Sequence, residues 1–406
     1  MSVPRAFANA RRGQSVLLVA NYRPDVGYAW WLMENFWLEF AAVARARSLE
    51  PIIAYPLPGV VPQSIRDAGI PTIVEPFPGK GIAGLIRSLR FVRARRVRCI
   101  YFTDRGFTSF RYALFRLLGV QLIINHDHTP GDRPPINGLK GLLKYFWRRI
   151  VFMSCDLQLS VSPLMRERAI VNARIPRSRA IVVQNGIEPI ECRGGRSYAH
   201  RIFGIPNDAH ICITVGRAHP YKRIDFVIEV ARRCIVERGA KNLFFLHCGD
   251  GPDIKRLRGL VEQAGLGERF ILAGKRSDVR ELLCSADIAI HAARGEAFSL
   301  AVLEYMSAGL ALLVPEVASV RQAVRDGKTG IVYPDGDADA AAQAILTLLQ
   351  NPEFRKRLGA AAADEVRERF SSSAMNRAFR AVIIDALRRR GYDEIITAPA
   401  AEVGAH

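Results

Sequence analysis

The chain has 406 residues, of which 49% are hydrophobic, and its formal net charge is +19. This length exceeds what one ordinary hydrophobic core holds and predicts two domains. The sequence has no uncharged apolar run of about 18 residues and no apolar stretch directly behind the basic residues 1–12. These features argue against a transmembrane helix and a signal peptide, and we expect a cytoplasmic protein.

The positive charge is concentrated in the first half of the chain. Up to Pro189 there are 27 Lys and Arg against 12 Asp and Glu, and the remainder has 31 against 27. A basic first half favours anionic partners such as lipid headgroups, phosphorylated acceptors or nucleic acid, although a merely arginine-rich protein has the same composition. Because no stacked aromatic and basic motif is present, we expect no nucleic-acid partner.

Strand-like apolar runs alternate with helix-length segments from end to end. In the first half they lie at residues 16–20, 52–55, 70–74, 99–102, 122–125 and 157–161, and in the second at 211–215, 243–247, 270–272, 288–290, 312–314 and 330–333. This repeat predicts an α/β protein with two doubly wound parallel sheets.

The segment 188–201 has little periodicity and contains Pro189, Gly194 and Gly195, so it predicts a linker. After Pro352 the pattern is helical to about Gly391. We therefore predict a first domain over residues 1–190 and a second over 191–370. Residues 371–406 complete the chain as a C-terminal helix, which can pack back on the first domain, and a frayed tail.

The seven cysteines occupy positions 99, 155, 192, 212, 234, 248 and 284 without a C-x-x-C pair. Most lie in apolar runs, where a reduced thiol packs as a small hydrophobic group. We expect neither a disulfide framework nor a zinc site.

Residues 137–150 predict an amphipathic helix. Leu139, Leu142, Leu143, Phe146 and Ile150 form an apolar stripe, and Lys140, Lys144 and Arg148 form a basic one. Such a helix either packs its stripe on the sheet or lies on anionic lipid, and both interpretations stay open. The arginine-rich run 87–98 is likewise either a solvated helix face or a patch for lipid and phosphate.

Ligands of open α/β sheets bind outside the carboxyl ends of the strands, so polar residues directly after strands are candidates. Arg217 and Lys222 follow the strand at 211–215 and can hold a diphosphate and stabilise its charge as it leaves. Gly249 and Gly251 follow the next strand. A nucleotide contact explains these glycines about as well as a plain βα turn does.

Two glutamates, Glu296 and Glu304, stand with seven residues between them at a loop-to-helix junction. Apolar spacing predicts a helix over 299–307, ended by Gly309 and followed by a core strand at 311–314. Glu296 then precedes the helix and Glu304 lies inside it. The backbone N–H groups of residues 298–300, which are Phe298, Ser299 and Leu300, would meet a phosphate at the helix start.

Over roughly residues 205–370 these motifs, in this order, resemble the family 4 glycosyltransferases of the GT-B fold, also called glycosyl transferases group 1. The resemblance is carried by residues 215–217 with Lys222, 249–252, 274–287, 296–304 and 328–334. It is weaker in the first half, at 126–127, 154–162 and 184–187. It implies two Rossmann-like domains facing a cleft, the first on the acceptor side and the second binding a nucleoside diphosphate sugar.

The resemblance also implies a role for each matching residue. Gly216, Arg217 and Lys222 would bind the donor diphosphate, Glu304 the ribose hydroxyls, and the backbone near Lys275 and Arg276 the base. Glu296, with the amides of residues 298–300, would hold the sugar and the distal phosphate. His126 would lie near the transferred sugar, and Gly27, Asp127 and His128 would lie on the acceptor side. The catalytic set is thus Glu296, His126, Arg217 and Lys222, without a metal or another cofactor.

Several positions depart from the family pattern. The loop after the first strand has one glycine, Gly27, among bulky aromatic residues. Arg223 and Ala297 replace usual glycines, and residues 319–322 lack the usual Gly-Gly and glutamate. These changes put acceptor binding and the last donor loop in doubt.

The resemblance implies a retaining hexosyltransferase that transfers sugar to a glycan or a lipid-linked acceptor. We expect a role in cell-envelope, exopolysaccharide or lipopolysaccharide biosynthesis, at the inner face of the cell membrane with its anionic surface as a partner. A nucleotide-sugar epimerase of the same fold and a non-catalytic basic binding protein are the alternatives.

Overall fold

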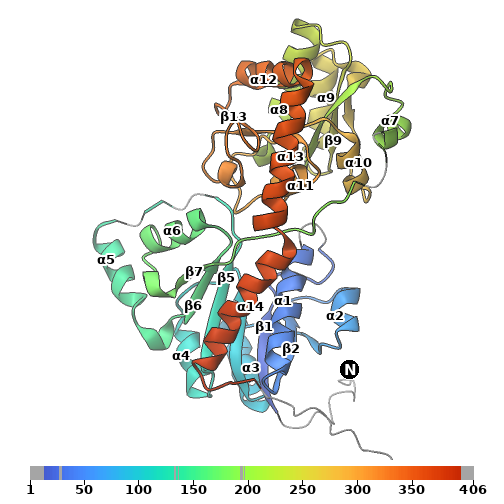
Figure 1. Ribbon diagram of the computed structural model, residues 1–406. Helices are drawn as coiled ribbons and strands as arrows, with labels where there is room; N and C mark the ends of the chain where they lie inside the picture. Colours follow the sequence, from blue (N-terminus) through green and yellow to red (C-terminus); the bar gives the residue numbers. More distant parts are fainter. Residues whose placement is uncertain are drawn as a thin grey trace, which may run out of the picture. The chain divides into compact units, whose positions relative to one another are not determined.

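The computed structural model describes residues 13–26, 30–131, 134–135, 137–192, 195 and 197–394. By its internal contacts the chain divides into two compact units (Figure 1). Unit 1 comprises residues 1–129, 133–183 and 376–406, and unit 2 comprises 130–132 and 184–375.

Unit 1 is built on a seven-stranded parallel sheet with the strand order β3-β2-β1-β4-β5-β6-β7. The strands are β1 (Gln14–Val19), β2 (Leu49–Tyr55), β3 (Thr72–Val74), β4 (Val97–Thr103), β5 (Leu122–Asp127), β6 (Leu157–Ser160) and β7 (Ala180–Val182). The helices are α1 (Trp30–Arg45), α2 (Gln63–Asp67), α3 (Gly81–Ala94), α4 (Phe110–Leu117), α5 (Gly138–Trp147) and α6 (Pro163–Val171), with short 3₁₀ turns η2 (Val151–Met153) and η3 (Arg177–Arg179). Most of α14 (Ser372–Arg388) also belongs to this unit.

Both faces of this sheet are buried, as is usual for parallel sheets. Because side chains on both faces are then apolar, the strands appear in the sequence as continuous apolar runs. On one face, Leu17 of β1 belongs to the same core as Val92 of α3 and Phe115 of α4. On the other face, Tyr101 of β4 packs against an aromatic ring of α1 and against Phe379 of α14. The last helix thus completes the hydrophobic core of unit 1.

Unit 2 has a six-stranded parallel sheet with the order β10-β9-β8-β11-β12-β13. The strands are β8 (His210–Val215), β9 (Leu243–Cys248), β10 (Phe270–Leu272), β11 (Ile288–Ile290), β12 (Ala311–Pro315) and β13 (Ile331–Tyr333). The helices are α7 (Ser197–Phe203), α8 (Ile224–Arg232), α9 (Ile254–Gln263), α10 (Val279–Ser285), α11 (Leu300–Ser307), α12 (Ala338–Gln350) and α13 (Pro352–Arg369). Shorter turns are η4 (Pro220–Lys222), η5 (Arg233–Glu237), η6 (Gly267–Arg269) and η7 (Arg321–Ala323). The prediction of two doubly wound parallel sheets is confirmed.

One local prediction is wrong in part, and one strand was missed. The segment expected to be an irregular linker contains α7, which begins at Ser197, and the strand β7 was not expected. The helical pattern after Pro352 is interrupted between α13 and α14, because Ile187 donates its N–H to the carbonyl of Phe370 at 2.9 Å and accepts from the N–H of Ser372 at 2.7 Å. This backbone pairing takes the hydrogen bonds that a continuous helix would use.

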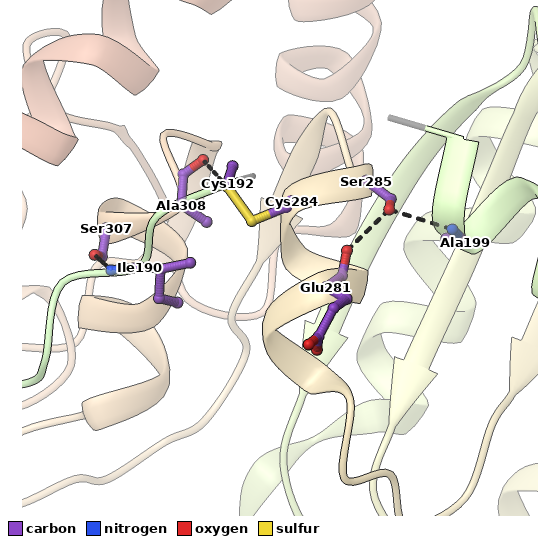
Figure 2. The surroundings of a disulfide bond; sticks show 8 residues. All are labelled: Ile190, Cys192, Ala199, Glu281, Cys284, Ser285, Ser307 and Ala308. Atoms are coloured by element: carbon purple, nitrogen blue, oxygen red, sulfur yellow. Dashed lines mark hydrogen bonds between the residues drawn. A yellow bond between two sulfur atoms is a disulfide. The ribbon is translucent and has the colours of Figure 1, made fainter. Parts of the chain in front are cut away.

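A disulfide joins Cys192 to Cys284 of α10 (Figure 2). The expectation that the cysteines pack as reduced thiols is wrong for this pair, while Cys99, Cys155, Cys212, Cys234 and Cys248 are free and buried. Cys192 and Cys284 are 92 residues apart in the sequence. Pairing over such a separation cannot be predicted from the spacing of the cysteines, so this disulfide was not expected.

Residues before and after Cys192 also form hydrogen bonds to α11 and α10. Before it, the N–H of Ile190 donates to Ser307 Oγ at 2.8 Å, at the end of α11. After it, the N–H of Ala199 donates to Ser285 Oγ at 3.2 Å, at the end of α10 (Figure 2). The chain on both sides of Cys192 is therefore tied to the ends of α10 and α11.

In each sheet the strand order reverses once, between β1 and β4 in unit 1 and between β8 and β11 in unit 2. Open α/β sheets bind ligands at such switch points, beyond the carboxyl ends of the strands. The fold thus directs attention to the loops after β8 and β11. In the part of the chain that the structure describes, every helix is too short or too polar to cross a membrane.

Candidate functional site

The loops after β8, β9 and β10 are closely packed against one another. A Cβ on Gly249 would lie 1.8 Å from the carbonyl oxygen of Gly216, and one on Gly251 would lie 2.4 Å from that of Ala218. The N–H of Gly249 donates to Gly274 at 2.8 Å, and the N–H of Ala218 donates to Asp250 at 3.0 Å. The glycines after β9 therefore let neighbouring loops touch, which is the plain βα-turn role considered from the sequence.

Lys222 and Glu296 meet at the switch point of unit 2. Lys222 ends the turn η4 after β8, Glu296 lies in the loop after β11, and their side chains form an ion pair. The two side chains are only 13% and 14% exposed. The structure thus brings together two of the residues predicted to be catalytic.

The environment of Glu296 keeps its carboxylate ionised. Burial alone would raise the pKa of Glu296, but the hydrogen bond from His291 and the charge of Lys222 outweigh burial and lower the pKa to about 2. His291 Nε2 lies 3.4 Å from Glu296 Oε1. At neutral pH this group is consequently a hydrogen-bond acceptor rather than an acid.

Three residues that fix this loop were missed from the sequence. His291 directly follows β11, so the search for polar residues after strands could have found it. The Oγ of Ser319 accepts the N–H of Glu296 at 3.4 Å, and the side-chain amide of Gln322 donates to the carbonyl of Ala297 at 3.1 Å. The segment 319–322, which departs from the family pattern, therefore binds the backbone around Glu296.

Glu304 lies in α11, as predicted, with the opposite electrostatic character. Burial raises the pKa of Glu304 to about 7, against the opposing charges of Arg280 and Lys222. Two carboxyl groups on one site thus have widely separated pKa values.

The first turn of α11 is as expected from the sequence. Ser299 caps the helix, its Oγ accepting the N–H of Val302 at 3.4 Å, and the helix continues from Leu300 to Ser307 before Gly309 adopts a positive φ of 72°. Phe298 is buried and packs on the ring of Phe370. The first N–H groups of a helix lack intrahelical acceptors, so this end can receive an anion.

The predicted cationic residues have different surroundings. Arg217 is exposed and lies beside the Tyr221 ring, with the guanidinium carbon 6.0 Å from the ring centroid. Lys275 is exposed. Arg276 forms a paired contact with Asp278, whose pKa falls to about 2 because of that hydrogen bond. The side chain of Arg276 is thus paired within its own loop.

In unit 1, His126 is completely buried at the end of β5. Its Nδ1 lies 2.6 Å from the hydroxyl of Tyr101, and its ring packs against Phe36 and Phe379. Burial, followed by the neighbouring His128, lowers the pKa of His126 well below its usual value. His126 is therefore a neutral imidazole, and its Nε2 has no hydrogen-bond partner among the described residues.

Of the other acceptor-side candidates, His128 packs beside this histidine, with ring centroids 4.1 Å apart. The N–H of His128 donates to Asp104 Oδ1 at 2.6 Å, and Asp104 also accepts from Asn21 at 3.4 Å across the β1–β4 switch point. Asp127 accepts the N–H of Thr129 and lies 3.5 Å from Arg168. Gly27 lies outside the described residues. Over the described ranges, no group of three His, Cys, Asp or Glu residues is arranged to hold a metal ion.

A hollow of about 830 Å³ lies elsewhere in unit 2, between α8, α9 and the start of α12. Its arginines are paired with acids, as in Arg233 with Asp339 and Arg256 with Asp253. Glu296, Glu304, Arg217 and Lys222 are not among its lining residues. The residues predicted from the sequence thus lie at the switch point and not at this hollow.

Comparisons with known proteins point to the same unit. Residues 196–365 match the family model described as glycosyl transferases group 1. The N-acetyl-alpha-D-glucosaminyl L-malate synthase of Bacillus anthracis is 27% identical over 186 residues, which are 46% of this chain and 48% of that protein. The match thus spans about half the length of this curated relative.

Solved structures are similar over nearly the whole chain. A glycosyltransferase from Rickettsia africae has a TM-score of 0.77 at 16% identity, covering 92% of this chain and 99% of that one. HepE from Anabaena, solved with UDP and glucose, has a TM-score of 0.70 at 16% identity, covering 91% and 99%. At this identity the likeness concerns the fold. The chain therefore has the fold of the GT-B glycosyltransferases, and its residues 196–365 are similar to the glycosyl transferases group 1 family.

Proposed function

We propose that this protein is a retaining glycosyltransferase that moves a sugar from a nucleoside diphosphate sugar to a hydroxyl group. The observation that carries the proposal is the Lys222–Glu296 pair at the switch point of unit 2, beside the start of α11. The similarity of residues 196–365 to the glycosyl transferases group 1 family supports it, as does the UDP and glucose in the similarly folded Anabaena HepE.

The diphosphate is proposed to bind between Arg217, Lys222 and the first turn of α11. Lys222 is neutralised by one carboxylate in the ligand-free chain. A diphosphate carries more negative charge than a carboxylate and attracts Lys222 more strongly. The exposed Arg217 and the N–H groups at the helix start then share the remaining charge, which grows as the sugar departs.

The two glutamates are proposed to hold the two sugars of the donor. Glu296, ionised because its pKa is about 2, accepts hydrogen bonds from hydroxyls of the transferred sugar. Glu304, whose burial raises its pKa to about 7, accepts from the ribose hydroxyls once it loses its proton. Neutral hydroxyl donors suit both carboxylates because they add no charge to a buried site.

In the proposed step the bond between the sugar and the diphosphate oxygen breaks, and a bond to the acceptor oxygen forms on the same face. The electron pair of the broken bond stays on the diphosphate, and its oxygen takes the acceptor proton. Neither a metal nor another cofactor takes part in this proposal. The acceptor is a glycan or lipid-linked molecule of the cell envelope, reached at the inner face of the membrane.

The test is a thermal-shift series with UDP-, GDP-, ADP- and TDP-sugars, since a ligand that binds only the folded state raises its Tm. One nucleotide should raise the Tm of the wild type and raise that of Glu304→Ala much less. Glu262→Ala, which removes an exposed glutamate of α9, is the matched control and should respond like the wild type.

Product analysis then separates the candidate activities. A retaining transferase yields a glycoside with the anomeric configuration of the donor, and Glu296→Gln should lower kcat/KM by about 10²-fold or more. A nucleotide-sugar epimerase would instead yield an altered nucleotide sugar without an acceptor. Absence of any Tm shift and of any turnover would leave a basic binding protein.

A further inference from the structure

The helix α5 exposes its apolar stripe. Leu139 is 71% exposed, Leu143 is 61% exposed and Phe146 is 60% exposed. Of the two arrangements open from the sequence, packing of this stripe on the sheet is therefore excluded within unit 1. Figure 1 shows α5 at the periphery of that unit, in green.

The orientation of α5 follows from its one buried residue, Gly141. Successive helical residues turn by about 100°, so Gly141 lies on the face opposite Leu139, Leu143 and Phe146. The small glycine permits close approach of the helix to the rest of unit 1. The apolar stripe consequently points away from the protein.

The exposed apolar surface continues past the end of the helix. Ile150, Val151 and Phe152, in and before the turn η2, are 42%, 58% and 47% exposed. We call the full set the α5 face, and it consists of Leu139, Leu142, Leu143, Phe146, Trp147, Ile150, Val151 and Phe152. Contiguous apolar surface of this kind marks an interaction site in folded proteins.

Charge indicates which partner covers the α5 face. Between residues 137 and 155 the chain carries Lys140, Lys144, Arg148 and Arg149 and no carboxylate. A second copy of the same face would bring like charges together, which disfavours a symmetric dimer through this surface. Anionic headgroups would instead neutralise the cations while the acyl region receives the apolar stripe.

The side-chain chemistry also suits a lipid interface. Arg149 lies over the ring of Tyr145, with its guanidinium carbon 3.2 Å from the ring centroid, and donates to the Tyr145 carbonyl at 3.0 Å. Tyr145, Phe146 and Trp147 occupy consecutive positions beside these cations. Aromatic residues next to Lys and Arg are typical of helices that lie in the plane of a membrane interface.

We propose that the α5 face docks unit 1 on an anionic phospholipid surface, with α5 lying parallel to that surface. The stripe enters the boundary between headgroups and acyl chains, and the exposed Lys140 and Arg149 bind headgroup phosphates. This proposal names the surface behind the membrane location in the proposed function, but its test is independent of sugar transfer.

The test is flotation with vesicles of phosphatidylcholine alone and of phosphatidylcholine mixed with phosphatidylglycerol. The wild type should float with the anionic vesicles at low salt and dissociate as salt rises. The double variant Leu143→Ser and Phe146→Ser should lose about tenfold or more in apparent affinity, because exposed apolar side chains supply the insertion energy. Val60→Ser, at another exposed apolar position of unit 1, should bind like the wild type.

A second pair of substitutions tests the electrostatic part. Lys140→Gln with Arg149→Gln should weaken binding to anionic vesicles and reduce its salt dependence. Because all four altered residues are exposed, the Tm of each variant should equal that of the wild type, which separates lost docking from lost folding. A blue shift of tryptophan fluorescence on vesicle binding, absent in Trp147→Phe, would place α5 at the interface.

Three outcomes overturn the proposal. The wild type fails to float with anionic vesicles at low salt, or the double variant floats as well as the wild type. In the third, sedimentation equilibrium finds a dimer that the double variant abolishes, without vesicle binding, so that a second copy covers the face. Each result stands whether or not nucleoside diphosphate sugars bind to unit 2.

Discussion

Lys222 and Glu296 form an ion pair across the point where the strand order of the unit 2 sheet reverses. They are 74 residues apart in the sequence and come from the loops after two neighbouring strands, β8 and β11. The pair thus holds against each other the ammonium group proposed to bind phosphate and the carboxylate proposed to bind sugar hydroxyls.

Removing either partner of this pair should destabilise unit 2. Lys222→Met leaves the Glu296 carboxylate largely buried beside His291 without its cationic partner, and should lower the free energy of unfolding by about 3 kcal/mol. Glu296→Gln should cost less, since the amide keeps the shape and a hydrogen bond. Urea unfolding of the single and double variants measures the coupling, and additive losses would contradict the ion pair.

Glu304 should make stability depend on pH between 4.5 and 7. Because burial raises the pKa of Glu304 from 4.5 to about 7, the folded chain binds this proton more tightly than the unfolded chain. Its contribution is therefore greatest below pH 4.5 and is lost as the pH rises towards 7. Glu304→Gln lacks this titration, so between these pH values its stability relative to the wild type should improve by about 3 kcal/mol.

Glu296 should make stability depend on pH in the opposite direction to Glu304. Its pKa is lowered from 4.5 to about 2, so its contribution is complete above pH 4.5 and is lost as the pH falls towards 2. The stability difference between the wild type and Glu296→Gln should therefore shrink in acid. A Glu304→Gln variant with the same pH profile as the wild type would refute the raised pKa.

Replacing Arg223 by glycine should give a more stable protein than replacing it by alanine. This residue adopts a left-handed conformation, with φ 54° and ψ 46°, between η4 and α8. Its side chain lies 3.5 Å from Asp335 and stacks over Phe226. Both Arg223→Gly and Arg223→Ala lose these contacts, but only alanine retains the steric cost of a positive φ. The glycine variant should be more stable than the alanine variant by about 1 kcal/mol.

Thermal unfolding of the two variants checks this difference. Gly309→Ala serves as a comparison, because Gly309 also has a positive φ, of 72°. It should lose a similar amount relative to the wild type. Equal Tm values for Arg223→Gly and Arg223→Ala would mean that the backbone at this position relaxes without strain.

The sequence predicts the sheets well because buried parallel strands consist of apolar runs that need no partner to be recognised. It misses β7, a strand of only three residues at the edge of the sheet, where Ile181 and Val182 are only half-buried. The helical pattern after Pro352 does not by itself show where α13 ends, since the interruption depends on Ile187, far away in the chain. Local patterns identify elements, and long-range backbone pairing decides where they end.

The candidate site shows the same division. Residue type and spacing predict Lys222, Glu296 and Glu304, but not that the first two neutralise each other or that the two glutamates differ in pKa. Those properties depend on burial and on His291, which the fold supplies. The place of His126 near the transferred sugar stays a prediction, and in unit 1 its ring is buried against aromatic side chains.

The disulfide between Cys192 and Cys284 should stabilise unit 2, because it fixes the chain around Cys192 to α10. It closes a loop with a sequence separation of 92 residues, so its removal should lower the free energy of unfolding by about 2–4 kcal/mol. Cys192→Ala, Cys284→Ala and the double variant should all lose the same amount, because one crosslink is lost in each. Dithiothreitol should lower the Tm of the wild type to that of the variants and leave theirs unchanged.

Thiol titration in denaturant distinguishes this crosslink from two adjacent reduced cysteines. Protein purified without a reductant should expose five thiols, belonging to the free cysteines, and seven after reduction. If the stability lost in the double variant equals the sum of the losses in the two single variants, each cysteine stabilises the protein through its own packing and not through a crosslink. A count of seven thiols before reduction, with a Tm that dithiothreitol does not change, would mean that no disulfide forms. The chain around Cys192 would then be held by the Ile190 and Ala199 hydrogen bonds alone.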